Sequence, residues 1–423
     1  MASAVFGPYL APNLGIRTEQ TVVYAAVVLI LVCGVWNRVR LNSHGVLAVG
    51  LQCVILVAAG IGTLFPVAGS AHQSGSALAM LDNLILPLCV IAVTAALGQI
   101  GGDRTQMIAA LCRTVVWLMI ANAFLTMVCV SSGTPEWLFA WWSGGGEAVA
   151  HGAEQMGRFS GIFNQPAEAG VLYSVAILGA IWLYQRSPVR LALVLVVLCS
   201  GGIITVSKIF LLGGIPVAVW QLLRPSMGWW RRSLAVTVAM AGAWIFSGAF
   251  PAWADQTPLF KLFPSNNADP LKLVTAGRFG EESILAPMAE VVWQSSPLVG
   301  LGVTGQVGAV DNGWMQALVV AGSVGVVGYT LLLATLAAAW WRIRDNGPDA
   351  RLAGGLLIIV AGGSLGLPVL TANRTATILW MLLVLLLLTP TSQRPNRDSH
   401  GGASSDQGAR TVSRAAKTIT LSS

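Results

Sequence analysis

The most informative shortage in this sequence is charge. Only 10% of the 423 residues are Asp, Glu, Lys or Arg, whereas a soluble domain carries roughly a quarter. Hydrophobic residues make up 55% of the chain, and apolar runs of about 20 residues, the length that crosses a bilayer as a helix, recur almost from end to end. The composition excludes an ordinary soluble enzyme and predicts an all-α, polytopic integral membrane protein.

Motifs for metals and nucleotides are also missing. The six cysteines include no CxxC pair, the four histidines are scattered singly, and there is no Asp-x-Asp, HExxH or Walker lysine pattern. We therefore expect no cofactor, no protein-bound structural metal and no ATP site. The net charge of +7 does not indicate nucleic acid, because the basic residues are dispersed through short loops rather than gathered with aromatic residues on one surface.

A single GxGxxG pattern is present at Gly300, Gly302 and Gly305. It follows a Pro-Leu-Val loop instead of a strand within a βαβ unit, which is the setting that dinucleotide binding requires. We interpret it as a tight backbone turn.

Apolar windows broken by polar or Pro/Gly clusters predict about eleven transmembrane helices. They lie near residues 20–37, 46–65, 77–99, 106–131, 169–185, 189–206, 208–223, 233–250, 312–341, 351–371 and 375–390. Residues 1–390 then form one membrane domain. Residues 391–423 are polar, rich in Ser and Gly and short of aromatic residues, which predicts a disordered tail.

Basic residues divide unevenly between the two sets of connecting loops. One set, together with the tail, holds 17 of the 24 lysines and arginines. The positive-inside rule places that set in the cytoplasm, so we expect a multi-pass protein of the cytoplasmic membrane with its amino terminus outside and its carboxyl terminus in the cytoplasm. Acidic residues concentrate in the outer loops: Glu136, Glu147, Glu154, Glu168, Asp255, Asp269, Glu281, Glu282, Glu290 and Asp311.

Two of the predicted extracytoplasmic loops are long. Residues 132–168 contain an aromatic cluster that ends at Trp142 and is followed by a Gly-rich stretch, as at a membrane interface. Within 251–311, the apolar residues of segment 279–295 fall largely on one helical face, broken by Pro287. This pattern predicts short helices that lie on the outer leaflet.

Four basic residues stand at or near helix ends on the predicted outer face: Arg158, Lys208, Arg278 and Arg374. A structural role explains any one of them, because arginine reaches headgroups or pairs with a carboxylate such as Glu168 or Glu282. Together they favour a jointly bound anion, and a diphosphate suits them because guanidinium forks match phosphate oxygens. Since ATP and nucleotide sugars are absent outside the cytoplasm, an enzyme that builds a polymer there needs a lipid-activated donor.

Further polar residues complete the candidate site. Asp311 begins the predicted span 312–341 and is either its helix cap, with Asn312 as the alternative cap, or a carboxylate that takes a proton from an acceptor hydroxyl. Asp82 lies a turn or two inside the span 77–99, where an intramembrane carboxylate indicates function by default. We take Asp82, Asn312 and Glu168 as candidate acceptor-side residues.

Three stretches resemble the O-antigen polymerase and ligase family, whose multispanning enzymes transfer glycans from polyprenyl diphosphate carriers. They are RFSGIFNQPAEAG ahead of a helix, TVSKIFLL where the family often has a Ser-Arg or Ser-Lys pair, and the region from Arg278 through SPLVGLGVTG to VDNGWMQALVVAGSVGVVGY. Together they cover roughly residues 157–330 and follow the family order.

The resemblance implies a site and an activity. In the family the basic residue of the pair and the arginine of the long loop bind the carrier diphosphate, and these correspond to Lys208 and Arg278. Ligases typically have His-Asn where this chain has Asp311-Asn312. The Asp-Asn pair is more similar to what repeat-unit polymerases have at this place. We therefore expect a polymerase of O-antigen, capsule or exopolysaccharide repeat units, with Asp311 and Arg278 as catalytic residues.

The partners that follow from the resemblance are a polyprenyl-diphosphate-linked oligosaccharide, membrane lipids, and flippase and chain-length regulator proteins. Two alternatives remain open: ligation of the glycan to a lipid, protein or wall acceptor, and transport of the lipid-linked glycan. Transporters commonly show internal repeats with broken helices in corresponding halves. The sequence shows no such symmetry, and its uneven outer loops favour an enzyme.

Overall fold

The computed structural model describes most of the chain before residue 391. The described residues are 1–11, 16–65, 77–100, 103–142, 147–223, 285–305, 310–345, 347–371 and 373–390, together with Trp229, Ser233 and Thr237. The chain divides into two units, Met1–Thr389 and Pro390–Ser423. The predicted tail 391–423 and nearly all of the predicted span 233–250 lie outside the described residues, so both stay predictions.

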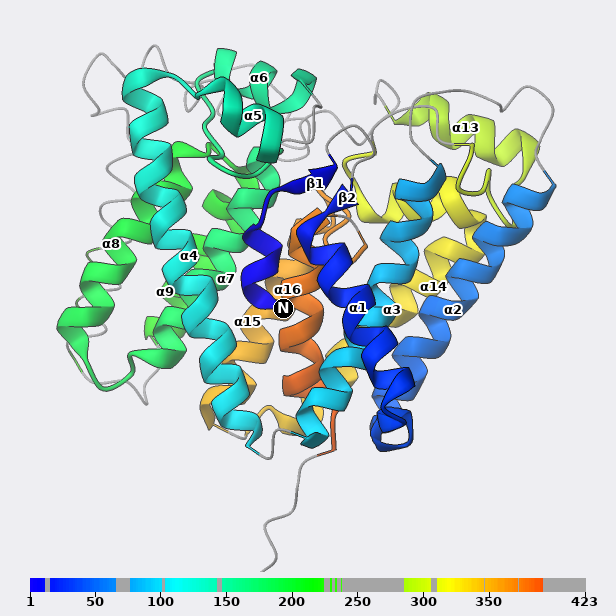
Figure 1. Ribbon diagram of the computed structural model, residues 1–423, viewed down its shortest axis with the longest axis horizontal. Coiled ribbons are helices and arrows are strands. Elements are labelled where there is room, and N and C mark those ends of the chain that lie inside the picture. The colour runs from blue at the N-terminus through cyan, green and yellow to red at the C-terminus, as the bar shows by residue number, and fades with distance from the viewer. Residues whose placement is uncertain are drawn as a thin grey trace, which may run out of the picture. The chain divides into compact units, whose positions relative to one another are not determined.

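The described part of the first unit is mostly helical (Figure 1). Its main helices are α1 (Thr18–Val32), α2 (Ser43–Leu64), α3 (Ala77–Ile100), α4 (Arg104–Ser132), α7 (Pro166–Leu183), α8 (Pro188–Ile204), α9 (Ile215–Leu223), α14 (Gly313–Ile343), α15 (Gly347–Gly363) and α16 (Asn373–Leu383). Short π-helices precede α9 and follow α16: η4 (Ile209–Gly214) and η6 (Val384–Leu388). Every predicted span other than 233–250 overlaps one of these helices.

Among the described residues, five helices are long and apolar enough to cross a membrane: α2, α3, α4, α7 and α14. The apolar helices α1, α8, η4 with α9, and α16 with η6 are shorter. The prediction of a helical membrane protein is confirmed at this level. The number of spans, the loops and the orientation stay predictions.

Helix α7 lies at the centre of the bundle. It contacts α4, α8, η4 and α15, and its residues from Glu168 to Ile181 are all buried. Small residues allow this close approach, as they do in many membrane helix pairs. At Gly170 an added Cβ would lie 2.1 Å from the Ser207 hydroxyl oxygen, so only glycine lets the start of η4 reach α7.

The amino-terminal segment is part of the bundle. It forms a short 3-10 helix, η1 (Ala2–Phe6), and an antiparallel pair of short strands, β1 (Tyr9–Ala11) and β2 (Ile16–Arg17). Val5 and Phe6 are buried, and η1 contacts α1, α4 and α16 (Figure 1). The Trp142 indole N–H donates to the Phe6 carbonyl at 3.0 Å. The sequence patterns did not predict this packing.

Helix α14 covers the predicted span 312–341 and is interrupted within it. Ala321 and Gly322 have non-helical backbone, with φ of 62° at Gly322. The preceding loop supplies hydrogen bonds at the break: the Leu301 amide donates to the Val319 carbonyl at 2.7 Å, and the Ser323 amide donates to the Pro297 carbonyl at 2.8 Å. Irregular backbone inside a membrane protein requires such internal partners.

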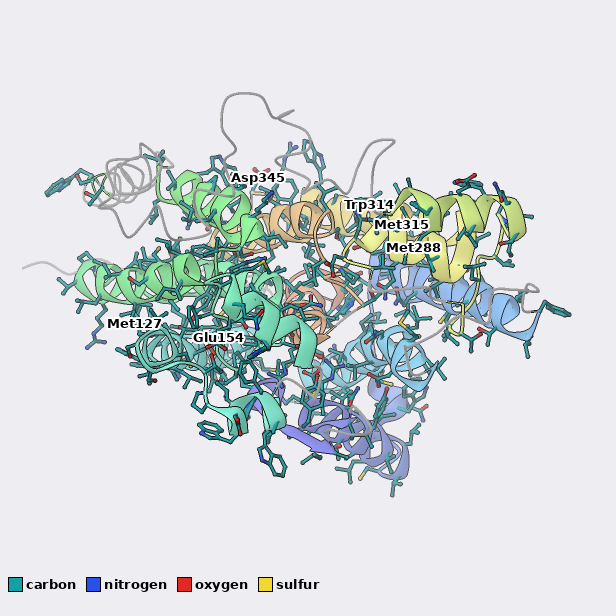
Figure 2. All side chains as sticks on the ribbon, turned by 90° about the horizontal axis from the view of Figure 1, so that it is seen from above. Met127, Glu154, Met288, Trp314, Met315 and Asp345 are labelled. Atoms are coloured by element: carbon teal, nitrogen blue, oxygen red, sulfur yellow. The ribbon has the colours of Figure 1, made fainter. Side chains whose placement is uncertain are left out.

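The helix predicted in segment 279–295 is present as α13 (Ala286–Ser295) and packs on α14. Val292 forms a small core with residues of α14, beside which Met288 and Met315 are partly buried (Figure 2). Pro287 lies in the first turn, where a helix does not need its N–H. The described helix therefore begins beside Pro287, where the pattern of segment 279–295 was expected to be broken.

Glycine conformation confirms the expected turn within the GxGxxG pattern. Gly300 and Gly302 have φ of 71° and 72°, values that residues with a side chain rarely adopt. A Cβ on Gly302 would lie 2.4 Å from the Thr63 amide nitrogen. The pattern therefore fits the loop against the end of α2.

Candidate functional site

Segments that are far apart in the sequence meet where α7, α14 and α16 begin. The loop before α7 reaches the end of α8 through the Phe159 amide, which donates to the Ile204 carbonyl at 3.4 Å. The start of α14 is bound to the segment before α16, because the Gly313 amide donates to the Ser364 carbonyl at 2.8 Å. We call this region the polar end; it comprises residues 157–168, 204–208, 310–316, 364–371 and 373–374.

The pair Ser207-Lys208 lies in a turn with strained backbone. Val206 has φ of 48°, in a region that costs a β-branched residue roughly 1–2 kcal/mol. Ser207 is 1% exposed, and its hydroxyl has no hydrogen-bond partner among the described residues. Lys208 is half-buried and precedes the π-helix η4. Backbone strain and π-helical turns both occur often at functional sites, so the turn 205–208 is a candidate on structural grounds.

Arg158 begins the loop 158–165, which leads from α6 (Glu147–Gln155) to α7. Its side chain is half-buried. Asn122 of α4 fixes the loop: its amide nitrogen donates to the Ser160 carbonyl at 3.3 Å, and its side-chain oxygen accepts from the Ile162 amide at 3.0 Å. The buried Asn164 side-chain oxygen has no hydrogen-bond partner among the residues that the structure describes.

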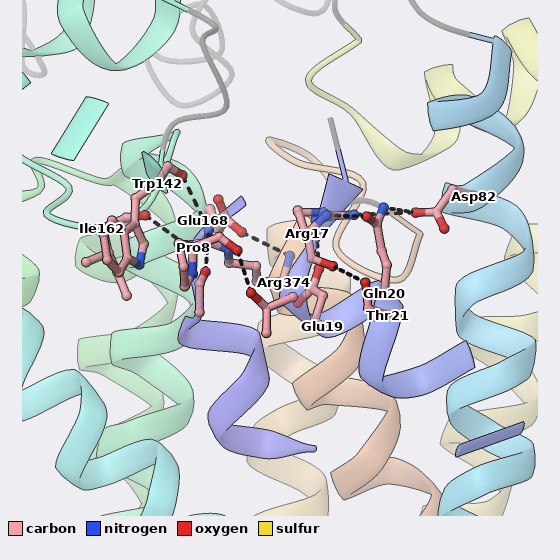
Figure 3. Close-up of polar contacts among 12 residues, drawn as sticks. Pro8, Arg17, Glu19, Gln20, Thr21, Asp82, Trp142, Ile162, Glu168 and Arg374 are labelled. Carbon is pink, nitrogen blue, oxygen red and sulfur yellow. Dashed lines mark hydrogen bonds and ion pairs between the residues drawn. The ribbon is translucent and has the colours of Figure 1, made fainter. Parts of the chain in front are cut away.

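Arg374 has a different setting from Arg158 and Lys208. It is 3% exposed, and its backbone amide donates to a Glu168 carboxylate oxygen at 3.0 Å. Its guanidinium donates to three backbone carbonyls (Figure 3), those of Ile162 (2.8 Å), Gly7 (3.1 Å) and Trp142 (3.3 Å). We therefore assign Arg374 and its partner Glu168 structural roles, and we leave Arg374 out of the proposed diphosphate set.

Asn312 caps α14. Its side-chain oxygen accepts from the Met315 amide at 3.0 Å, and its amide nitrogen donates to the Leu365 carbonyl at 3.2 Å. Of the two alternative caps, the structure therefore has Asn312 and not Asp311, and Asn312, 2% exposed, has a structural role. Asp311 lies two residues before the first residue of α14 and is half-buried, so a chemical role for it stays a prediction.

Asp82 belongs to a buried polar group at the start of α1. Arg17 forms an ion pair with Glu19 at 2.8 Å and a longer one with Asp82 at 3.5 Å. Gln20 also donates to the Asp82 carboxylate (Figure 3), and so does the Tyr24 hydroxyl. Asp82 thus joins α3 to α1, and these contacts give it a structural role.

The same polar group continues to Arg374 through the strand pair. Tyr9 pairs with Arg17 across the strands, and its ring lies 5.7 Å from the Arg374 guanidinium. Burial raises the pKa of the Tyr9 hydroxyl, although Arg17 and Arg374 act in the opposite direction. Burial by itself would lower the pKa of the Arg17 guanidinium. Charge interactions with Glu19, Tyr9 and Asp82 raise that pKa by a larger amount, so the net shift is upward. Arg17 therefore stays charged within the bundle.

Sequence reasoning missed Arg17 and Glu19 as members of this group. A local signal was present in Gln20, whose side-chain oxygen accepts from the Arg17 amide at 2.6 Å at the start of α1, as in one half of a capping box. No sequence spacing, however, relates Arg17 to Asp82.

Arg278 lies outside the described residues, so its place relative to Lys208 stays a prediction. No known protein-family model matches this chain, and its sequence has no significant match among curated proteins.

Proposed function

We propose that this protein is a membrane glycosyltransferase that polymerises lipid-linked oligosaccharide repeat units at the outer face of the cytoplasmic membrane. The observation that carries the proposal is the meeting of the Arg158 loop, the strained turn before Lys208 and the start of α14 at one end of the apolar helices. These are the segments whose sequence resembles the O-antigen polymerase and ligase family.

The proposed reaction breaks the bond between the anomeric carbon of the donor glycan and its diphosphate oxygen. The acceptor hydroxyl of a second lipid-linked repeat unit forms the new bond to that carbon and gives its proton to Asp311. Polyprenyl diphosphate leaves with the bonding electrons. Lys208, Arg158 and Arg278 stabilise the negative charge that develops on the departing diphosphate, a form of electrostatic stabilisation that needs no metal.

Transport of the same lipid is a second candidate, because broken helices line the binding sites of many transporters and α14 is broken at Ala321 and Gly322. Backbone groups at the break, however, are hydrogen-bonded by the loop 296–303. In a transporter such groups would face the cargo. This difference favours the polymerase, and ligation to a separate acceptor differs from it only in the acceptor.

The test is extension of a single substrate by the purified protein in detergent. Supplied with one lipid-linked repeat unit and no other acceptor, a polymerase makes a ladder of longer lipid-linked chains. A ligase leaves that substrate unextended until its own acceptor is added, and a transporter moves it across proteoliposomes without changing its mass. The absence of a ladder with the correct repeat unit would refute the proposed function.

A further inference from the structure

A polar pocket lies at the far end of α14 from the polar end, and the proposed reaction does not use it. It encloses about 200 Å³ between the end of α9, the end of α14 and the start of α15. The side chains that matter in its lining are those of Trp220, Trp340, Arg344, Asp345 and Arg351. We call it the arginine pocket.

The charges of the arginine pocket suit an anion. Arg344 is held over the Trp341 ring, with its guanidinium carbon 4.0 Å from the ring centre. Its ion pair with Asp345 is long, at 3.7 Å, and the Asp345 side chain is 91% exposed, so this pair contributes little stability. Among the described residues that line the pocket, Arg344 and Arg351 carry two positive charges and Asp345 carries one negative charge. One phosphodiester group would bring its net charge to zero.

Two tryptophans place the arginine pocket at the boundary between apolar helix and polar loop. The Trp340 indole N–H donates to the Ala350 carbonyl at 2.8 Å, and a Cβ on Gly354 would lie 2.8 Å from the same indole nitrogen. The Trp340 side chain is therefore held against α15. The Trp220 side chain, which also lines the pocket, is 41% exposed. Tryptophan at the end of an apolar helix marks headgroup depth in a bilayer, where acyl chains lie beside the helices and phosphates lie beside the arginines.

We propose that the arginine pocket binds the phosphodiester headgroup of an anionic phospholipid. The lipid belongs to the leaflet on the arginine-rich face, the side of the loops that hold most of the lysines and arginines. Guanidinium forks bind two phosphate oxygens at once, and basic pockets between membrane helices are known binding sites for anionic headgroups. The indole rings contact the glycerol and upper acyl carbons of the same lipid. This site is independent of the proposed glycan transfer.

The experiment compares lipid retention by the full-length protein in detergent, measured by native mass spectrometry with phosphatidylglycerol and phosphatidylcholine. Wild type retains phosphatidylglycerol preferentially. The double variant Arg344→Gln/Arg351→Gln loses that preference, by roughly fivefold for each arginine removed. A charge-matched control, Arg190→Gln/Arg342→Gln, changes two exposed arginines outside the pocket and keeps the preference.

Three outcomes would overturn the proposal: no preference in wild type, an equal loss in the control pair, or displacement of the lipid by inorganic phosphate or glycerophosphoglycerol at equal concentration. The last outcome would assign the pocket to a soluble phosphate ester. If the double variant aggregates, Arg344→Glu replaces it, because Arg344 is 44% exposed and tolerates exchange. Unchanged phosphatidylglycerol retention in folded Arg344→Glu would equally refute the proposal.

Discussion

Burial separates the basic residues of the polar end into two kinds. Arg374 is enclosed and donates to three backbone carbonyls from three segments. Lys208 and Arg158 are half-buried at turns that precede or follow helices. A cation of the first kind stabilises the fold, whereas we expect one of the second kind to contact the diphosphate of the proposed donor. Substitutions should separate the two roles.

Arg374→Lys is expected to destabilise the protein by about 2–4 kcal/mol, because a single ammonium group cannot reach three carbonyls from a buried position. The measurement is the melting temperature of the purified protein in detergent. Arg190→Lys, at an exposed position on α8, is the control and should melt like wild type. A normal melting temperature in Arg374→Lys, combined with loss of product, would return Arg374 to the diphosphate set.

Lys208→Ala and Arg278→Ala are each expected to lower the rate of chain extension by about 100-fold or more while the protein still inserts and accumulates. Arg278→Lys should fail as well if the diphosphate needs a bidentate fork. Chain length on gels and protein level in membranes are the two measurements. Wild-type chain lengths in both alanine variants would eliminate the diphosphate site.

Substitutions of Asp311 and of its neighbour Asn312 should affect different properties, turnover in the first case and stability in the second. Asn312→Ala removes the cap of α14 and should cost about 1–2 kcal/mol of stability. Asp311→Asn leaves that cap in place and should lose turnover with little change in melting temperature, because the amide cannot accept the proton. A ladder that persists undiminished in Asp311→Asn would remove the residue from the reaction.

At the scale of elements, the break in α14 depends on a specific residue, Gly322, and on the loop that packs against it. Gly322 has φ of 62°, and a Cβ there would lie 2.4 Å from the backbone of Leu298. The loop 296–303 therefore fits against the break only while residue 322 is glycine. Through Gly302 and Thr63 the same loop reaches the end of α2, so the break helps to join α2, α13 and α14.

Gly322→Ala is expected to destabilise the protein by roughly 2 kcal/mol or more, since both the left-handed backbone and the close approach to Leu298 forbid a side chain. The control is Gly60→Ala in α2, where an added Cβ has nothing within 4 Å and alanine favours the helix by about 0.5–1 kcal/mol. Thermal melting compares the pair. Equal melting temperatures would show that the break does not depend on glycine.

At the scale of the whole molecule, the sequence predicts individual helices, which depend on local composition. It misses contacts between residues that are far apart in the chain. Apolar runs such as 106–131 define helices because hydropathy and length suffice. The break at Gly322 was missed because small apolar residues continue the run on both sides. The group around Asp82 was missed because its partners are distant in sequence: Arg17 ends strand β2 and Tyr24 lies on α1. The cap at Asn312 rather than Asp311 depends on a one-residue difference in where the helix starts.

The polar end was predictable only as a set of candidate residues. Arg374 and Lys208 look alike in sequence, each a basic residue in a short connection, and only their burial and hydrogen bonds distinguish them. Orientation depends on the distribution of lysine and arginine, and the proposed chemistry depends on that orientation. The face on which the reaction takes place is therefore the point to test.

The most direct measurement is ladder formation in sealed membrane vesicles of defined sidedness that contain the wild-type protein. The substrate is a lipid-linked repeat unit with a shortened prenyl chain, whose charged diphosphate prevents it from crossing the membrane. The predicted result is a ladder in right-side-out vesicles and none in sealed inverted vesicles until detergent opens them. A ladder made by sealed inverted vesicles alone would place the reaction on the arginine-rich face and contradict the proposed site.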